Sequence, residues 1–121
     1  MTALESESIG SWTRIRLPER VDVSNARAFV DLVRLELGSG HRWIVVDFAH
    51  TQAIDSTALG ALIQVHKSLL SNDGVLRLAA VGDGVRRVLA ITRVDRVFSI
   101  FDSAEAAIEH HGRPAEVLVY G

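Results

Sequence analysis

The chain has 121 residues, the usual size of one domain, and its 48% hydrophobic and 23% charged side chains are typical of a globular protein. Its 13 basic and 15 acidic side chains nearly cancel and are interspersed, so we expect neither direct nucleic-acid binding nor attraction to an anionic membrane. The sequence has no cysteine for disulfides or thiolate sites, no apolar run of about 20 residues for a membrane span and no signal peptide at its start, so we expect a cytoplasmic protein without direct membrane insertion.

The first third of the chain is predicted to hold two strands and a helix. Residues 1–11 are polar and acidic, and we expect a flexible N-terminal segment there. Apolar and polar side chains alternate over residues 12–17, which predicts a half-exposed strand, and a short return strand is expected near residues 21–23. Ser24 is a candidate cap for a helix that ends before Gly38, because apolar residues recur after it at the helical period.

Two apolar runs in the middle of the chain, residues 43–46 and 75–81, predict central strands that are covered on both faces. A helix is predicted between them, over residues 56–71, with His66 and the large apolar side chains on one face. Because His66 lies within this apolar stripe, we interpret it as a core residue and not as a ligand or general base. The opposite face carries small or polar residues, namely Thr57, Gly60, Gln64 and Lys67.

The last third is predicted to continue the alternation of helices and strands. A helix is expected over residues 83–92, an edge strand over residues 97–100, and a last helix that starts at a capping box headed by Asp102 and runs toward His111. Residues 112–121 form a C-terminal tail, expected as an added strand or a flexible end. The pattern predicts a single α/β domain with a mixed four- to five-stranded sheet, about four helices and right-handed crossovers.

The residue combinations that enzymes and metal sites need are missing. Gly82-Asp83-Gly84 lacks the third glycine of a dinucleotide-binding motif and is interpreted as a turn and helix cap. His110 and His111 would point in different directions on a helix and could not easily share a metal. Asp47 ends a central strand, as the acceptor of a phosphoaspartate receiver does, but the only lysine, Lys67, lies in a helix. We therefore expect no enzyme, no cofactor and no metal.

The most informative segment is residues 53–62, where a polar turn enters a helix whose exposed side is nearly free of bulky side chains. Either Asp55 or Ser56 is expected to cap this helix, a contribution of roughly 1 kcal/mol. Capping does not explain Gly60 one turn later, which costs about 1 kcal/mol relative to alanine. The close approach of a partner's backbone, or of a nucleotide, would explain it.

This segment resembles the signature of the STAS domains, and in particular of the bacterial anti-sigma factor antagonists. Val45-Val46-Asp47-Phe48 followed by Ile54-Asp55-Ser56-Thr57-Ala58-Leu59-Gly60 is similar to the strand, loop and Asp-Ser-Ser/Thr-Gly-Leu-Gly motif of that family. The likeness extends over residues 12–111, which we assign as the STAS domain. The sequence departs from the family pattern at Glu19, Ala58 and Arg93, where glycine is commoner. The departures at Glu19 and Arg93 affect the expected loop shape more than the function.

The resemblance implies a phosphorylation-controlled switch. An antagonist of this family binds an anti-sigma serine kinase with a histidine-kinase-like ATPase fold, is phosphorylated on the signature serine, and is released until a serine phosphatase removes the phosphate. Carried over by position, the phosphorylated residue is Ser56, with Thr57 as the fallback. The residues expected to bind the partner are Asp22, Asp55, Ser56, Thr57, Gly60 and Gln64. A phosphate at a helix N-terminus leaves the fold intact but disturbs a partner surface fitted to a neutral hydroxyl.

Two alternatives remain open. The same fold could act as a scaffold or adaptor subunit in a stress-signalling or membrane-transport assembly, and outside this family the chain could be a small-molecule-binding or enzymatic domain. A second apolar strip on the first predicted helix, formed by Ala28, Leu32 and Leu35, is either scattered exposed surface or a contact for a partner or a second copy in a homodimer.

Overall fold

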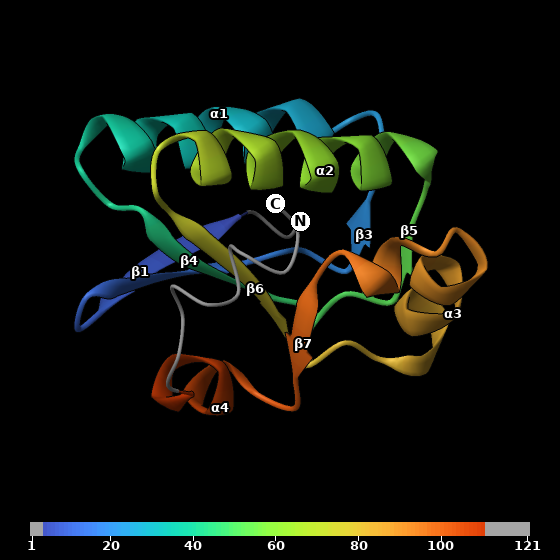
Figure 1. Ribbon diagram of the computed structural model, residues 1–121. Helices are drawn as coiled ribbons and strands as arrows, with labels where there is room; N and C mark the ends of the chain where they lie inside the picture. Colours follow the sequence, from blue (N-terminus) through green and yellow to red (C-terminus); the bar gives the residue numbers. More distant parts are fainter. Residues whose placement is uncertain (1–3, 111–121) are drawn as a thin grey trace.

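The computed structural model describes residues 4–110 and has a mixed five-stranded sheet as its centre (Figure 1). The strand order is β1-β2-β4-β6-β7, with β1 antiparallel to β2 and the other neighbours parallel. This architecture, with four α-helices, confirms the predicted fold class. The sheet strands are β1 (Glu5–Ile9), β2 (Trp12–Arg16), β4 (Trp43–Asp47), β6 (Val75–Ala79) and β7 (Ser99–Phe101). The helices are α1 (Ala26–Gly38), α2 (Ser56–Ser71), α3 (Asp83–Ile91), the 3-10 turn η1 (Val94–Arg96) and α4 (Ala104–Glu109).

Helices α1 and α2 lie side by side on one face of the sheet, whereas α4 lies on the other (Figure 1). Because side chains alternate along a strand, each central strand contributes side chains to two hydrophobic cores, one on each face of the sheet. The larger core joins the sheet to α1 and α2 and includes Ile15, Val46, Leu78, Phe29 and Leu62. The smaller core lies under α4 and includes Trp12, Val45, Val75, Ala79 and Ala107. Burial on both faces explains why β4 and β6 are continuous apolar runs in the sequence.

A buried arginine connects the smaller core to the end of α4. The side chain of Arg77 is fully buried on β6 and donates to the carbonyl oxygens of Ala107 at 2.5 Å and of His110 at 3.2 Å. Its guanidinium also lies 4.8 Å from the ring centroid of Trp12 and 5.3 Å from that of Phe101. A positive group at carbonyls of a helix C-terminus is electrostatically favourable, so Arg77 anchors α4 to the sheet.

The prediction of a flexible segment over residues 1–11 is wrong for Glu5–Ile9, which forms β1. This strand pairs with β2 through a tight turn in which Gly10 adopts a positive φ of 60°. Both faces of β1 are largely exposed, so its sequence lacks the apolar alternation that marks a half-buried strand. Backbone pairing along the edge of the sheet defines the strand instead.

Two of the predicted helix caps are displaced by one residue. Helix α1 has Asn25 at its N-cap position, and Ser24 instead donates to the carboxylate of Asp22. Helix α4 is capped by Ser103 and not by Asp102, because the Ser103 hydroxyl accepts a hydrogen bond from the amide of Ala106 at 3.0 Å. The last strand, predicted to begin at residue 97, begins at Ser99, because the turn η1 precedes it. The tail at residues 112–121 lies outside the described residues.

Candidate partner-binding site

The site begins with a short pair of parallel strands, β3 (Arg20–Val21) and β5 (Ala53–Ile54). Val21 is paired with Ile54, so the next residues, Asp22 and Asp55, leave the same edge of this small sheet. The amide of Asp55 donates to the carbonyl of Val21 at 3.3 Å. The structure thereby brings Asp22 near Asp55, the residue before Ser56, although the two segments are more than thirty residues apart in the sequence.

The cap of α2 is Asp55, which decides between the two residues that the sequence left open. Its carboxylate accepts a hydrogen bond from the amide of Ala58 at 2.9 Å. Ser56 is then the first residue of the helix, and its side chain is exposed. Among residues 4–110, no side chain or backbone group is hydrogen-bonded to the Ser56 hydroxyl. This hydroxyl is therefore accessible and contributes no bond to the fold.

Asp22 is held in place by the loop that precedes α1. Its carboxylate accepts hydrogen bonds from the hydroxyl of Ser24 at 2.6 Å and from the amide of Ser24 at 2.9 Å, and these bonds lower the pKa of Asp22. The side chain of Asn25 closes the same loop, accepting from the amide of Asp22 and donating to the carbonyl of Arg20. The local bonds keep Asp22 ionised and leave Val23 76% exposed at the tip of the loop.

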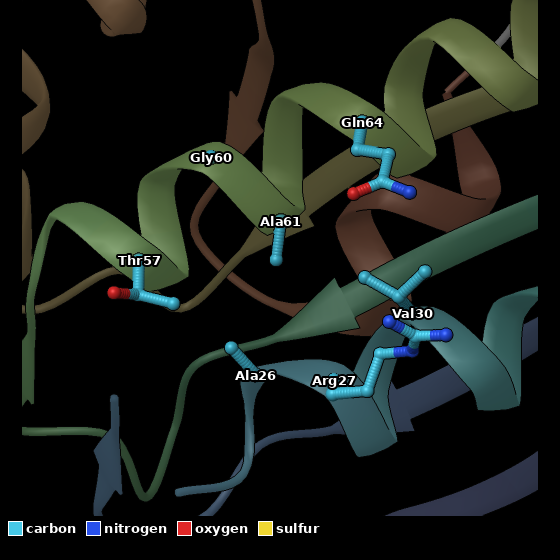
Figure 2. A pocket seen from close by; sticks show the side chains of 7 residues that line it. All are labelled: Ala26, Arg27, Val30, Thr57, Gly60, Ala61 and Gln64. Atoms are coloured by element: carbon cyan, nitrogen blue, oxygen red, sulfur yellow. The ribbon is translucent and has the colours of Figure 1, made fainter. Parts of the chain in front are cut away.

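A groove of about 410 Å³ runs between α1 and α2 next to these residues (Figure 2). Thr57, Gly60 and Gln64, three of the predicted partner-binding residues, line it from the α2 side. A Cβ atom placed on Gly60 would meet no atom within 4 Å, so the groove is open above this glycine. The remaining lining residues are Ala26, Arg27 and Val30 of α1 and Ala61 of α2.

The α1 side of the groove was missed by the sequence reasoning. Ala26 and Val30 are buried at its floor, and the guanidinium of Arg27 stands at its rim, paired with Asp31 at 3.2 Å. Only the packing of α1 against α2 brings these residues to the site. The sequence signal alone, a small residue at the start of an amphipathic helix, does not distinguish Ala26 from other core positions.

Two other residues considered in the sequence, Asp47 and His66, are buried within the fold. The carboxylate of Asp47 is buried and paired with Arg16 at 2.9 Å, and it also accepts from the amide of Ala49. His66 faces the core, as predicted, with its ring centroid 5.0 Å from that of Phe98. Burial lowers the pKa of His66. Within residues 4–110, no three histidine, cysteine, aspartate or glutamate side chains are grouped closely enough to hold a metal ion.

The second apolar strip on α1 is only partly exposed. Leu35 is 66% exposed and Ala28 is also exposed, whereas Leu32 is half-buried and packs against the larger core. The predicted helical phase of Leu35 is therefore correct, but the strip is narrower than expected. No helix in the described part of the chain is long and apolar enough to cross a membrane.

The fold and this signature segment agree with a known family. The family model described as the STAS domain matches residues 3–107. The chain belongs to the STAS domain family. A Thermotoga neapolitana relative, provisionally named an anti-sigma factor antagonist, is 33% identical over 97 residues, which cover 78% of this chain and 86% of the relative. The matched residues include β1, so this strand is part of the STAS domain.

Two solved structures superpose well on this chain. The crystal structure of a Thermotoga maritima protein, also provisionally named an anti-sigma factor antagonist, has a TM-score of 0.80 and 28% identity, and covers 88% of this chain and 92% of that one. The Bacillus cell fate determinant SpoIIAA, solved in its phosphorylated form, has a TM-score of 0.71 and covers 88% of this chain and 97% of that one. Its identity of 18% supports the shared fold alone.

Proposed function

We propose that this STAS chain is a cytoplasmic anti-sigma factor antagonist controlled by phosphorylation of Ser56. In the unphosphorylated state it binds an anti-sigma serine kinase of the histidine-kinase-like ATPase fold. Phosphorylation releases it, and a serine phosphatase restores the binding state. The observation that carries this proposal is the exposed Ser56 hydroxyl, free of hydrogen bonds among residues 4–110, at the start of α2 and beside the α1–α2 groove.

The surroundings of Ser56 suit a phosphate without loss of the fold. The first amides of a helix have no acceptor within the helix, and here Asp55 occupies only that of Ala58. The amides of Ser56 and Thr57 and the positive end of the helix dipole remain to offset the added charge of about −1.5 to −2. Because the side chain is already exposed, a phosphate there stays hydrated and displaces no core residue.

The same surroundings mean that phosphorylation of Ser56 would act on the binding of a partner. Asp22 and Asp55 both follow the paired strands β3 and β5 just before Ser56, so a phosphate on Ser56 adds negative charge to a region that already holds two acidic residues. A kinase surface fitted to a hydroxyl and to the small residues of the groove would have to desolvate a dianion there. The names of the Thermotoga relatives support the antagonist role, and SpoIIAA, which shares the fold, exists in a phosphorylated form.

The proposal is tested with the purified chain and an anti-sigma serine kinase from the same organism. Phosphopeptide mapping after incubation with the kinase and ATP is expected to find phosphate on Ser56. Isothermal titration is expected to show at least about tenfold weaker kinase binding for the phosphorylated chain, which corresponds to 1.4 kcal/mol. The melting temperature should change little, since the Ser56 hydroxyl makes no hydrogen bond within residues 4–110.

Two variants serve as controls. Ser56→Ala should bind the kinase and resist phosphorylation, whereas Thr57→Ala should still be phosphorylated. Phosphate found on Thr57 alone would contradict the assignment of Ser56. Equal kinase affinity of the phosphorylated and unphosphorylated chains would favour the alternative function, a STAS scaffold or adaptor subunit whose contacts do not depend on phosphate.

A further inference from the structure

A second surface, outside the groove, is formed by α3 and η1 beside β5 (Figure 1). Helix α3 buries Val85 and Leu89 against the larger core, so its apolar stripe is already used. Ile91 nevertheless lies 74% exposed at the end of the helix. Four exposed arginines share this unit with it: Arg86, Arg87, Arg93 and Arg96. We call these five residues the α3 surface.

The arginines of the α3 surface carry charge that the described chain does not neutralise. Elsewhere among the described residues, Arg14, Arg16 and Arg27 form ion pairs with acidic side chains, whereas Arg20, Arg34 and Arg42 do not. Within residues 4–110, none of the four arginines of the α3 surface forms an ion pair, since no carboxylate oxygen lies within 4.0 Å of their guanidinium nitrogens. The acidic residues on the same unit are Asp83 and Asp95, so α3, η1 and the residues between them carry four positive charges and two negative ones. The surface is therefore complementary to carboxylates.

Arg93 occupies a backbone conformation that disfavours it. Its φ of 63° lies in the left-handed region, directly after the C-cap Thr92. Glycine is the preferred residue at this position of a helix end, because a Cβ atom is strained there. The chain thus places an exposed guanidinium where a glycine would be the more stable choice. The left-handed conformation thus costs some stability and leaves the Arg93 guanidinium exposed on the α3 surface.

We propose that the α3 surface binds an acidic segment of a partner protein, with an apolar side chain of that segment over Ile91 and its carboxylates on the arginines. The guanidinium fork pairs with carboxylates through two parallel hydrogen bonds. Arginine is enriched at protein interfaces relative to the rest of the protein surface. A nucleic acid would gain little from Ile91 and would need a longer basic stripe. This contact does not depend on the state of Ser56.

The test titrates the full, isotope-labelled chain with two synthetic peptides and follows the amide resonances by NMR. One peptide has glutamates on both sides of a central leucine, and its twin has serine in place of that leucine. The resonances that move should map to α3 and η1, and the leucine peptide should bind at least about threefold more tightly. Ile91→Ser should remove this difference. Raising the salt concentration from about 50 mM to about 300 mM should weaken both peptides.

Charge variants identify the surface. Arg87→Glu should weaken the leucine peptide by at least about tenfold, whereas Arg34→Glu, an identical charge change at an exposed position on α1, should have little effect. Arg93→Gly should raise the melting temperature and still weaken the peptide. Equal losses in Arg87→Glu and Arg34→Glu, or shifts outside α3 and η1, would overturn the proposal. So would tighter binding of a single-stranded RNA or of phosphatidylglycerol vesicles than of the leucine peptide.

Discussion

Gly60 lies in the interior of α2, where glycine is less stable than alanine by about 1 kcal/mol. The structure indicates that this cost is not required by the fold, because a Cβ atom at Gly60 would meet nothing within 4 Å and the residue has no positive φ. Gly60→Ala is therefore expected to raise the free energy of unfolding by about 1 kcal/mol. For a domain of this size, that corresponds to an increase of about 3–6 °C in melting temperature.

The measurement is urea and thermal unfolding of the parent and the variant, followed by circular dichroism. Gly74→Ala is the control with the same substitution at a crowded position. Its Cβ would lie 2.5 Å from the carbonyl oxygen of Arg42, so this variant should be less stable than the parent. Gly84→Ala is an intermediate case, since its Cβ would lie 3.0 Å from the carbonyl oxygen of Gln52. A Gly60→Ala variant that unfolds at a lower urea concentration than the parent would refute the steric reasoning.

The same variant separates stability from binding. Gly60 lines the α1–α2 groove, so an added methyl group narrows the space that a partner's backbone would enter. If the proposed kinase contact uses this groove, Gly60→Ala should be more stable and yet bind the kinase more weakly. Unchanged kinase affinity in the stabilised variant would place the contact elsewhere, around Asp22 and Ser56 alone.

Two further predictions concern stability. Asp55→Ala removes the bond to the amide of Ala58 and should lower the free energy of unfolding by about 1 kcal/mol in urea titrations, whereas Ser56→Ala should change it little; equal losses would contradict the assignment of the cap. Burial lowers the pKa of His66 below its ordinary value of 6.5, so on acidification the unfolded chain gains a proton that the folded chain resists, and stability falls. The loss of stability between about pH 7 and about pH 5.5 should be smaller in His66→Leu, and an identical pH profile would contradict this account.

The elements with strong periodicity could be predicted from the sequence, and those defined by pairing or capping could not. Helix α2 and strands β4 and β6 follow apolar patterns set by burial on one or both faces. Strand β1 has no such pattern, because both of its faces are largely exposed and only its backbone is paired. Adjacent polar residues, such as Asp102 and Ser103, are both good caps, and only the backbone geometry selects between them.

The candidate site divides in the same way. Asp55, Ser56, Thr57, Gly60 and Gln64 lie on one continuous stretch, so a local motif was enough to propose them as partner-binding residues. The α1 wall of the groove depends on how two helices pack over the sheet, which no local pattern encodes.

Under the proposed function, the distribution of bonds around Ser56 allows phosphorylation to change binding without a cost to the fold. Asp55 caps α2, and Ser24 and Asn25 hold the loop that carries Asp22. The Ser56 hydroxyl takes no part in these bonds, so chemical change there removes no hydrogen bond among residues 4–110. A phosphate in this position alters the charge and shape presented to a partner while the helix start keeps its cap. Had Ser56 itself been the cap, modification would have coupled binding to the unfolding of α2.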